Sequence, residues 1–537
     1  MSDRIKRALF ILMRLYHNQA GNTLAIVAAA MLPLAGMVGG ALDISRGYLA
    51  KTRLQQACDA GALAGRKVMG SSGEISAAVT LEVQKYVNFN YPVGYLGSSP
   101  FTVTPTLGSN DQIELTISTT IPTVIMKLFS WNTMSISASC SARNDYTNID
   151  IVLVLDVTGS MACAPSRSTS SCNSYYSSNS GKTGTTTAGK SFKFVTEELD
   201  SKKVNISRIQ ALRTSLTNLQ AQMATIETQF NVAPENSRKR VRWAIIPFAQ
   251  LVNAGLSQDS TGATLYSRKP NWFNTTGTYQ STSNSSTRQS ISHDSNWIST
   301  TWDGCIEELK TSNSITLTSG HSAPNNLPSD AFDLKFDTEP SSTDTRWTVT
   351  DPSKAGNPVY ACPKPMREFS KLTATQFNDY FAFNTGFAAE GRTYLDSGML
   401  WAARLLSRTG LWKLENEATY HSFPVTRYVI FMTDGEMQTD GSVYSSYAQE
   451  NYWRRTTAAG ADGDSNHTAR WLMTCNAIKN MDVKIFAISF SAGSSVTQDM
   501  KDCSSGNGFW YRADDASDLD DVFRDIGENI GSLRLSR

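Results

Sequence analysis

The sequence predicts an α/β protein with a doubly wound parallel β-sheet, preceded by a membrane helix and a small α+β segment. An uncharged apolar run fills residues 24–42. Further along the chain, short apolar runs typical of buried strands occupy 149–155, 241–249, 427–433 and 483–491. Helical patterns at 207–227 and 518–531 lie between and after them. Strands that alternate with helices form parallel sheets covered by helices on both faces.

Composition limits the class of protein. The 537 residues fit roughly two to four domains. The 49 Lys and Arg residues nearly balance the 48 Asp and Glu residues, so no charge excess favours a nucleic-acid partner. Charged residues make up only 18% of the chain, below the usual quarter, as is frequent in exported proteins.

Eight cysteines follow the apolar run, and none forms a C-x-x-C motif or lies near a histidine at zinc-finger spacing. An even number beyond a membrane segment favours disulfides in an oxidising compartment. The alternative is buried free thiols in a cytosolic domain. Short separations favour three pairs and leave a fourth, namely Cys163–Cys172, Cys305–Cys362, Cys475–Cys503 and Cys58–Cys140.

The apolar run is long enough to anchor the chain. Its 19 uncharged positions cross about 30 Å of hydrocarbon as a helix. Four basic residues precede it within the first 14 and three follow it by residue 53, so charge alone favours neither orientation strongly. The disulfides require the long C-terminal part to lie outside, which predicts a cytoplasmic N-terminus. A cleaved signal peptide is disfavoured by the length of the run.

Residues 43–69 contain no proline and continue the apolar run as one predicted helix, and residues 100–143 alternate between apolar and polar types as three or four strands. The stretch QAGNTLAIVAAAMLPLAGMVGGALDISRGYLAKTRLQQACDAGALAGRK resembles the N-terminus of TadG-like proteins of the Flp (Tad) pilus assembly system. The resemblance implies a single-pass protein of the bacterial inner membrane with a pilin-like module in the periplasm. Processed pilins carry Glu five residues after the cleavage-site Gly, whereas Ile26 follows Gly21, so we expect the helix to remain.

The most informative segment for function is NIDIVLVLDVTGSM, where a buried strand ends at Asp156 and is followed by Thr158 and Ser160. Hydroxyl and carboxylate oxygens are the ligands that Mg²⁺ prefers. The segment resembles the Asp-x-Ser-x-Ser motif of von Willebrand factor A (VWA) domains, with Thr158 in place of the first Ser. In that family the metal ion accepts a carboxylate from a partner protein.

Two further segments match the same family in the expected order. RYVIFMTDGEM is a second strand that ends before Asp434, and AAEGRTYLDSGM matches the loop that supplies a threonine hydroxyl, here Thr393. The resemblance implies a metal site of Asp156, Thr158, Ser160, Thr393 and Asp434. Mg²⁺ is the expected ion, with Mn²⁺ or Ca²⁺ as alternatives. The competing interpretation is that the two aspartates only cap helices.

The predicted domain organisation has four parts: a cytoplasmic segment 1–19, a transmembrane helix 20–42, a pilin-like module 43–146 and a VWA domain 147–537. The last part exceeds a compact VWA domain by three insertions, at 162–203, 250–385 and 437–466, each following the carboxyl end of a strand. They are expected to crowd the metal face.

The insertions leave two further questions open. Their tryptophans serve either as a contact surface or, as we expect, as core filling; they are Trp272, Trp297, Trp302 and Trp347. The Ser/Thr-rich stretch 168–191 is expected to be flexible.

No enzyme motif stands out. The five histidines form no H-E-x-x-H motif, and no G-x-S-x-G elbow is present. Asp156 as a phosphatase-type nucleophile would call for a second acid where Thr158 stands. We therefore expect a non-enzymatic protein that binds an acidic partner through its metal, in pilus assembly, anchoring or adhesion. The alternatives are a structural envelope protein whose metal only stabilises the fold and, third, a metal-dependent hydrolase.

Overall fold

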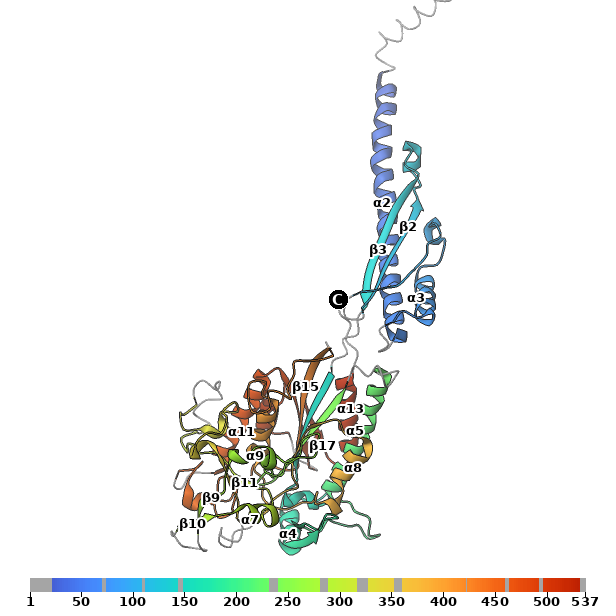
Figure 1. Ribbon diagram of the computed structural model, residues 1–537. Coiled ribbons are helices and arrows are strands. Elements are labelled where there is room, and N and C mark those ends of the chain that lie inside the picture. The colour runs from blue at the N-terminus through green and yellow to red at the C-terminus, as the bar shows by residue number, and fades with distance from the viewer. Residues whose placement is uncertain are drawn as a thin grey trace, which may run out of the picture. The chain divides into compact units, whose positions relative to one another are not determined.

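The computed structural model describes residues 22–69, 74–108, 112–142, 148–230, 240–280, 288–315, 327–351, 360–421, 423–458, 463–491 and 496–531 (Figure 1). The chain divides between Tyr146 and Thr147 into two compact units, each with its own hydrophobic core. The expected cytoplasmic segment 1–19 lies outside the described residues.

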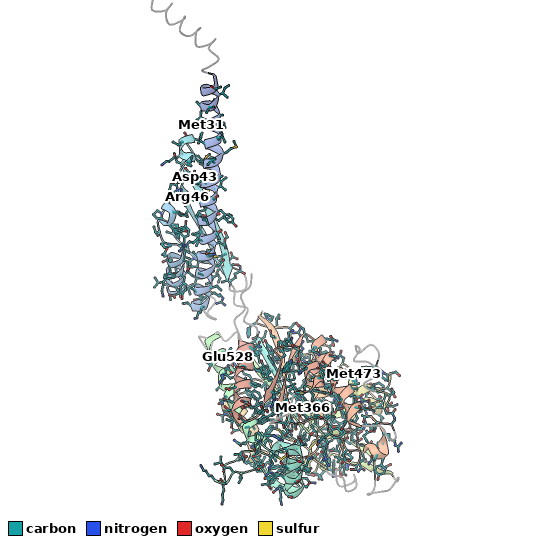
Figure 2. The ribbon with its side chains drawn as sticks, turned by 180° about the vertical axis from the view of Figure 1, so that it is seen from behind. Met31, Asp43, Arg46, Met366, Met473 and Glu528 are labelled. Atoms are coloured by element: carbon teal, nitrogen blue, oxygen red, sulfur yellow. A yellow bond between two sulfur atoms is a disulfide. The ribbon has the colours of Figure 1, made fainter. Side chains whose placement is uncertain are left out.

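The N-terminal unit is built on α2 (Asn22–Met69), a single helix of 48 residues. The predicted continuity of the apolar run with the segment 43–69 is therefore confirmed. Among the described residues, this is the one helix long and apolar enough to cross a membrane, judged by length and composition. Figure 2 shows Met31, Asp43 and Arg46 in succession along it.

A small antiparallel sheet and a second helix pack against the C-terminal half of α2. The sheet has the order β1 (Thr106–Leu107), β2 (Ile113–Pro122), β3 (Thr133–Ala142), and α3 spans Ala77–Asn90. Alternate β2 side chains are buried in a core with Leu54 of α2 and Val83 of α3. Gly61 allows the close approach of α3, because a Cβ there would lie 2.4 Å from Val87 Cγ2.

The C-terminal unit contains the predicted parallel sheet. Its strands run in the order β13-β7-β4-β15-β16-β17, with bounds Arg367–Ser370, Val241–Phe248, Asn148–Asp156, Phe423–Thr433, Val483–Phe490 and Trp510–Ala513. Neighbours from β7 to β17 pair in parallel, whereas β13 is antiparallel at one edge and β14 (Thr419–Tyr420) pairs with β15. All nine residues of β4 are buried, as expected for a central strand.

Helices cover both faces of this sheet. One core contains Leu153 of β4 with side chains of α5 (Arg208–Phe230), α8 (Ala374–Phe381) and α13 (Ala516–Gly531). The other contains Val154 of β4 with side chains of α9 (Leu395–Leu406), α11 (Gly463–Asn480) and α12 (Gln498–Cys503). Successive strand side chains point to opposite faces, so the continuous apolar run of β4 supplies both cores.

The segment after β4 is folded rather than flexible. It contains α4 (Thr169–Asn179) and the hairpin of β5 (Lys182–Thr185) with β6 (Ser191–Phe194). Ser168 caps α4 through the amide of Ser171, and the rings of Phe192 and Phe194 pack on Phe383. The expectation of a flexible stretch at 168–191 is therefore wrong, because a cap and distant aromatic contacts order it.

The insertion after β7 adds its apolar side chains to the core that α9 and α11 form on one face of the sheet. It holds short strands β8 (Phe273–Asn274), β9 (Thr276–Gln280), β10 (Arg288–Ser292), β11 (Ile306–Glu307) and β12 (Trp347–Val349), and short helices α6 (Leu265–Arg268) and α7 (Ser295–Thr300). Trp272, Trp302 and Trp347 are buried, and Trp297 packs on the same core. The interpretation of these tryptophans as core filling is confirmed.

Buried ion pairs join the insertions to the helices of the sheet. Arg404 of α9 binds Glu308 at 2.7 Å, and Arg470 of α11 binds Asp333 at 2.6 Å. After β15, the segment 437–466 includes α10 (Glu450–Trp453). Because β4, β7 and β15 are parallel, the three long segments leave from the same edge of the sheet.

All eight cysteines are paired, which confirms the disulfide interpretation. The pairs are Cys163–Cys172, Cys305–Cys362 and Cys475–Cys503, which short separations favour, and the remaining pair Cys58–Cys140.

Candidate metal site

Two neighbouring parallel strands end in carboxylates at the same edge of the sheet. Asp156 is the last residue of β4, and Asp434 directly follows β15, which pairs with β4 in parallel. Thr393 precedes α9, whose side chains pack against this sheet. Ligand sites of parallel sheets lie at this edge, because loops from several strands converge there.

The five residues singled out in the sequence lie together. The hydroxyls of Thr158 and Ser160 are 3.1 Å apart, and Ser160 donates a hydrogen bond of 2.8 Å to Asp434 Oδ1. Thr393 Oγ1 donates to Thr158 Oγ1 at 3.4 Å. Three segments distant in the sequence thus contribute oxygens to one cluster.

Asp156 organises the loop that carries the hydroxyls. Its Oδ1 accepts a hydrogen bond from the amide of Thr158 at 2.8 Å, and its Oδ2 accepts one from Thr433 Oγ1 at 2.6 Å. Asp434 bonds to the side chains of Ser160 and Arg208 rather than to the first turn of a helix. Among these contacts, neither carboxylate acts as a helix cap, so the capping interpretation lacks support.

Burial makes the negative charge of the cluster unfavourable. Asp156 is fully buried, and burial together with repulsion from Asp434 raises the pKa of Asp156 to about 7. A positive charge near two buried carboxylates stabilises their ionised form.

Arg208 supplies one such charge, although no sequence motif singles this residue out. Its Nη1 donates to Asp434 Oδ2 at 2.8 Å and to the carbonyl of Ser160 at 3.3 Å, and its Nη2 donates to the carbonyl of Arg167 at 3.2 Å. Arg208 is the first residue of α5, where the helix dipole disfavours a cation. An arginine at the first position of a helix is unfavourable unless an acidic side chain lies nearby, and this is the one sequence signal for the partner of Arg208.

The loops around the cluster are tied to one another. The amide of Glu390 donates to the carbonyl of Val157 at 2.9 Å, and the amide of Gly159 donates to the carbonyl of Gly391 at 3.1 Å. Gly159 has no room for a side chain, since a Cβ would lie 2.1 Å from the ring of Tyr176. These contacts hold the loop of Thr393 against the loop of Asp156.

The donor set fits a hard divalent cation. Three hydroxyls and two carboxylates offer oxygen ligands, and the two carboxylates outweigh the single charge of Arg208. A cation here would relieve the repulsion that raises the pKa of Asp156. Residues 156, 158, 160, 393 and 434 are the residues that would hold it.

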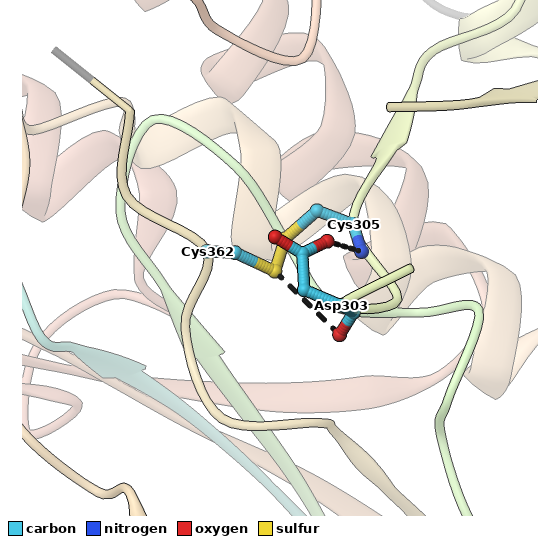
Figure 3. Close-up of side chains that lie close together, drawn as sticks. All are labelled: Asp303, Cys305 and Cys362. Carbon is cyan, nitrogen blue, oxygen red and sulfur yellow. Dashed lines mark hydrogen bonds between the residues drawn. A yellow bond between two sulfur atoms is a disulfide. The ribbon is translucent and has the colours of Figure 1, made fainter. Parts of the chain in front are cut away.

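A second group of metal-ligating residue types lies in the insertion after β7 (Figure 3). Asp303 there is close to Cys305 and Cys362, and burial raises the pKa of Asp303 to about 6. The two cysteines are joined in a disulfide, so neither offers a thiolate to a metal. This group therefore does not form a competing metal site in the oxidised protein.

Comparison with known families identifies the N-terminal part. Residues 21–78 match the family described as "Putative Flp pilus-assembly TadE/G-like". The resemblance of this segment to the Flp (Tad) system is therefore confirmed. No curated protein matches the chain.

Several solved structures show a distant likeness. The pilus adhesin SpaC from Lactobacillus rhamnosus GG matches at 11% identity over 80% of this chain and 33% of SpaC, with a TM-score of 0.30. The PilB minor pilin from Streptococcus sanguinis matches at 10% identity over 81% of this chain and 78% of PilB, with a TM-score of 0.32. The vWF domain of the type V pili tip protein Mfa5 from Porphyromonas gingivalis matches at 9% identity over 72% of this chain and 96% of that domain, with a TM-score of 0.30.

The matched part of this chain spans about a third of the length of SpaC. TM-scores near 0.3 are too low for these likenesses to support a function. The interpretation of the site depends on its own geometry.

The raised pKa of Asp156 predicts a pH-dependent stability. Between the ordinary value of 3.8 and about 7, the folded protein holds a proton that the unfolded chain has lost. In chelator, the free energy of unfolding should fall as pH rises through this range, by on the order of 4 kcal/mol at most. Denaturation from pH 4 to 8 measures this, and Asp156→Asn should flatten the profile. An unchanged slope in Asp156→Asn would refute the assignment.

The ion pair between Arg208 and Asp434 predicts an effect on cation affinity. Replacing Arg208 with Met removes a positive charge from the cluster, so Mg²⁺ should bind at least about tenfold more tightly, roughly 1.4 kcal/mol. The metal-free variant should be less stable, because Asp434 loses its partner. Calorimetric titration measures the affinity, and Arg208→Lys is the control that keeps the charge. Equal affinity in wild type and Arg208→Met would contradict the predicted competition.

Proposed function

We propose that this chain is a membrane-anchored VWA-domain protein that binds a partner protein through a divalent metal in Flp/Tad pilus assembly, anchoring or adhesion. The observation that carries the proposal is the cluster of Asp156, Thr158, Ser160, Thr393 and Asp434 at the carboxyl edge of a parallel sheet. The family match of residues 21–78 supports the pilus context.

The architecture supports a doubly wound VWA domain over residues 147–537. The strand that carries Asp156 lies between β7 and β15, and helices cover both faces of the sheet. The loop after β4, the loop before α9 and the loop after β15 meet at one place, as the chemistry of such a site requires. Residues 43–146 would form the pilin-like module.

Mg²⁺ is the proposed ion, since it favours compact sets of oxygen ligands and retains some water. When bound, it supplies an electrophilic position that a carboxylate of the partner can occupy. The chain's own residues prepare that position. Asp156 orients the loop by accepting a hydrogen bond from the amide of Thr158. Arg208 neutralises part of the negative charge of the cluster through its ion pair with Asp434, so the ion faces a smaller net negative charge.

Ser160, the partly exposed residue of the cluster, marks its accessible side. Asp156 and Thr158 are almost fully covered, whereas Ser160 keeps part of its surface. Because most of the cluster is buried and three long segments leave the same edge of the sheet, we expect a partner to reach the ion through a projecting acidic side chain. A covered site of this kind favours a specific protein ligand.

Anchoring follows from α2. We propose that residues 20–42 span the bacterial inner membrane, with residues 1–19 in the cytoplasm and the disulfide-bonded remainder in the periplasm. Four disulfides distributed over both units support an oxidising compartment. No feature of the cluster calls for catalysis, and we propose a binding role without enzymatic activity.

Binding to partners should depend on the metal and on its ligands. We expect the full-length protein, reconstituted in nanodiscs, to capture its partner from solubilised bacterial envelope in Mg²⁺ and to lose at least about 90% of it in chelator, a tenfold effect. Thr393→Val removes one hydroxyl with little change of shape and should cause a similar loss. Quantitative mass spectrometry of captured proteins measures this.

The control is Asp521→Ala, which removes an exposed carboxylate far in the sequence from the cluster. It should capture as the wild type does. If chelator and Thr393→Val lower the melting temperature but leave capture intact, the metal stabilises a structural envelope protein instead. Equal capture with and without metal, at unchanged stability, would refute metal-dependent binding.

A further inference from the structure

The turn that joins β2 to β3 lies alongside the apolar part of α2. This tip, residues 123–132, includes the short helix η4 (Met126–Phe129). A Cβ at Gly39 would lie 2.3 Å from Ile125 Cγ2, and one at Gly36 would lie 3.7 Å from Phe129 Cζ. The tip therefore contacts α2 within the apolar run 24–42.

Asp43 fixes the height of the tip along α2. Its carboxylate accepts three hydrogen bonds from backbone amides of the tip, from Val124 at 2.8 Å, Ile125 at 3.1 Å and Met126 at 2.9 Å. Asp43 is the first charged residue after the apolar run and is almost fully buried. Its own charge is thereby satisfied by the tip rather than by water.

The register places the tip beside the last two turns of the run. A helix rises 1.5 Å per residue, so Gly36 lies about 10 Å from Asp43 toward the N-terminus. The apolar residues of α2 at this level are themselves exposed; they include Met37, Val38 and Leu42. Whatever surrounds α2 here also surrounds the tip.

The outward side chains of the tip are apolar and unusually exposed. Leu128 is 78% exposed, Trp131 63% and Phe129 43%. The tip carries a single charged residue, Lys127, whose long aliphatic chain allows its ammonium group to reach a lipid headgroup. Trp at the edge of such a patch is typical of a membrane interface.

We propose that this tip inserts into the bilayer leaflet at the Asp43 end of α2, as a second membrane contact of the N-terminal unit. The inference rests on the proposed anchoring by α2. A bilayer is the occupant that the contacts favour, because Ile125 and Phe129 join the patch directly to the apolar part of the spanning helix at Gly39 and Gly36. Two contacts joined through Asp43 would hold the sheet of this unit at a defined height above the membrane.

Trp131 allows a direct test, because it is the only tryptophan in the first 146 residues. The full chain is reconstituted in nanodiscs with phosphatidylcholine brominated on the acyl chains, and Trp131→Phe is measured beside it. The fluorescence lost in Trp131→Phe is the Trp131 component. We expect brominated lipid to quench at least half of this component. The control is Trp510, a half-buried tryptophan of the C-terminal unit. The fluorescence lost in Trp510→Phe is its component, and brominated lipid should leave that component unquenched.

A charge at the tip should abolish the contact. Leu128→Glu should reduce the quenching of Trp131 by more than half, whereas Phe89→Glu, at an equally exposed apolar residue on α3 of the same unit, should leave it unchanged. An unquenched Trp131 component in protein that resists alkaline extraction would overturn the insertion and leave the anchor intact. If Trp131 is not quenched and the protein can be crosslinked as a dimer, the patch contacts a second copy of the chain instead. Protein that alkaline extraction releases from membranes would overturn the anchor itself.

Discussion

The repulsion between two buried carboxylates, Asp156 and Asp434, is the constraint around which the C-terminal unit is arranged. Both end neighbouring parallel strands, and an uncompensated buried charge is costly. Arg208 and the hydroxyl of Ser160 compensate the charge of Asp434, and the hydroxyl of Thr433 donates a hydrogen bond to Asp156. The compensation is incomplete, since Asp156 retains a raised pKa. That remaining demand for positive charge is what makes the cluster suited to a divalent cation.

The surrounding segments can be understood as supports of this edge of the sheet. The Cys163–Cys172 disulfide closes the loop that follows Ser160, and backbone hydrogen bonds join the loops of Val157 and Glu390. Farther out, ion pairs such as Glu308–Arg404 fasten the insertions to α9 and α11. A site whose walls are tied by covalent and buried polar contacts is preorganised for a ligand.

Much of this architecture could be predicted from local patterns. Asp156 and Asp434 each follow a continuous apolar run, and a strand end at a parallel sheet brings such residues together. Arg208 could not be found in this way, because its partner lies 226 residues away. The tip held by Asp43 has no local sequence signal for the same reason, since its contacts join residues more than 80 positions apart. The hairpin at 182–194 differs from the flexible stretch that the sequence predicts, because its order depends on the distant ring of Phe383.

The most direct test of the account is the number of metal ions bound to the full-length protein. Titration with Mn²⁺ followed by electron paramagnetic resonance counts bound ions and reports oxygen coordination. The account predicts one Mn²⁺ per chain, displaced by Mg²⁺, and no tight binding in Asp156→Ala or in Asp434→Ala. Binding of the same number of ions by wild type and both variants would contradict it.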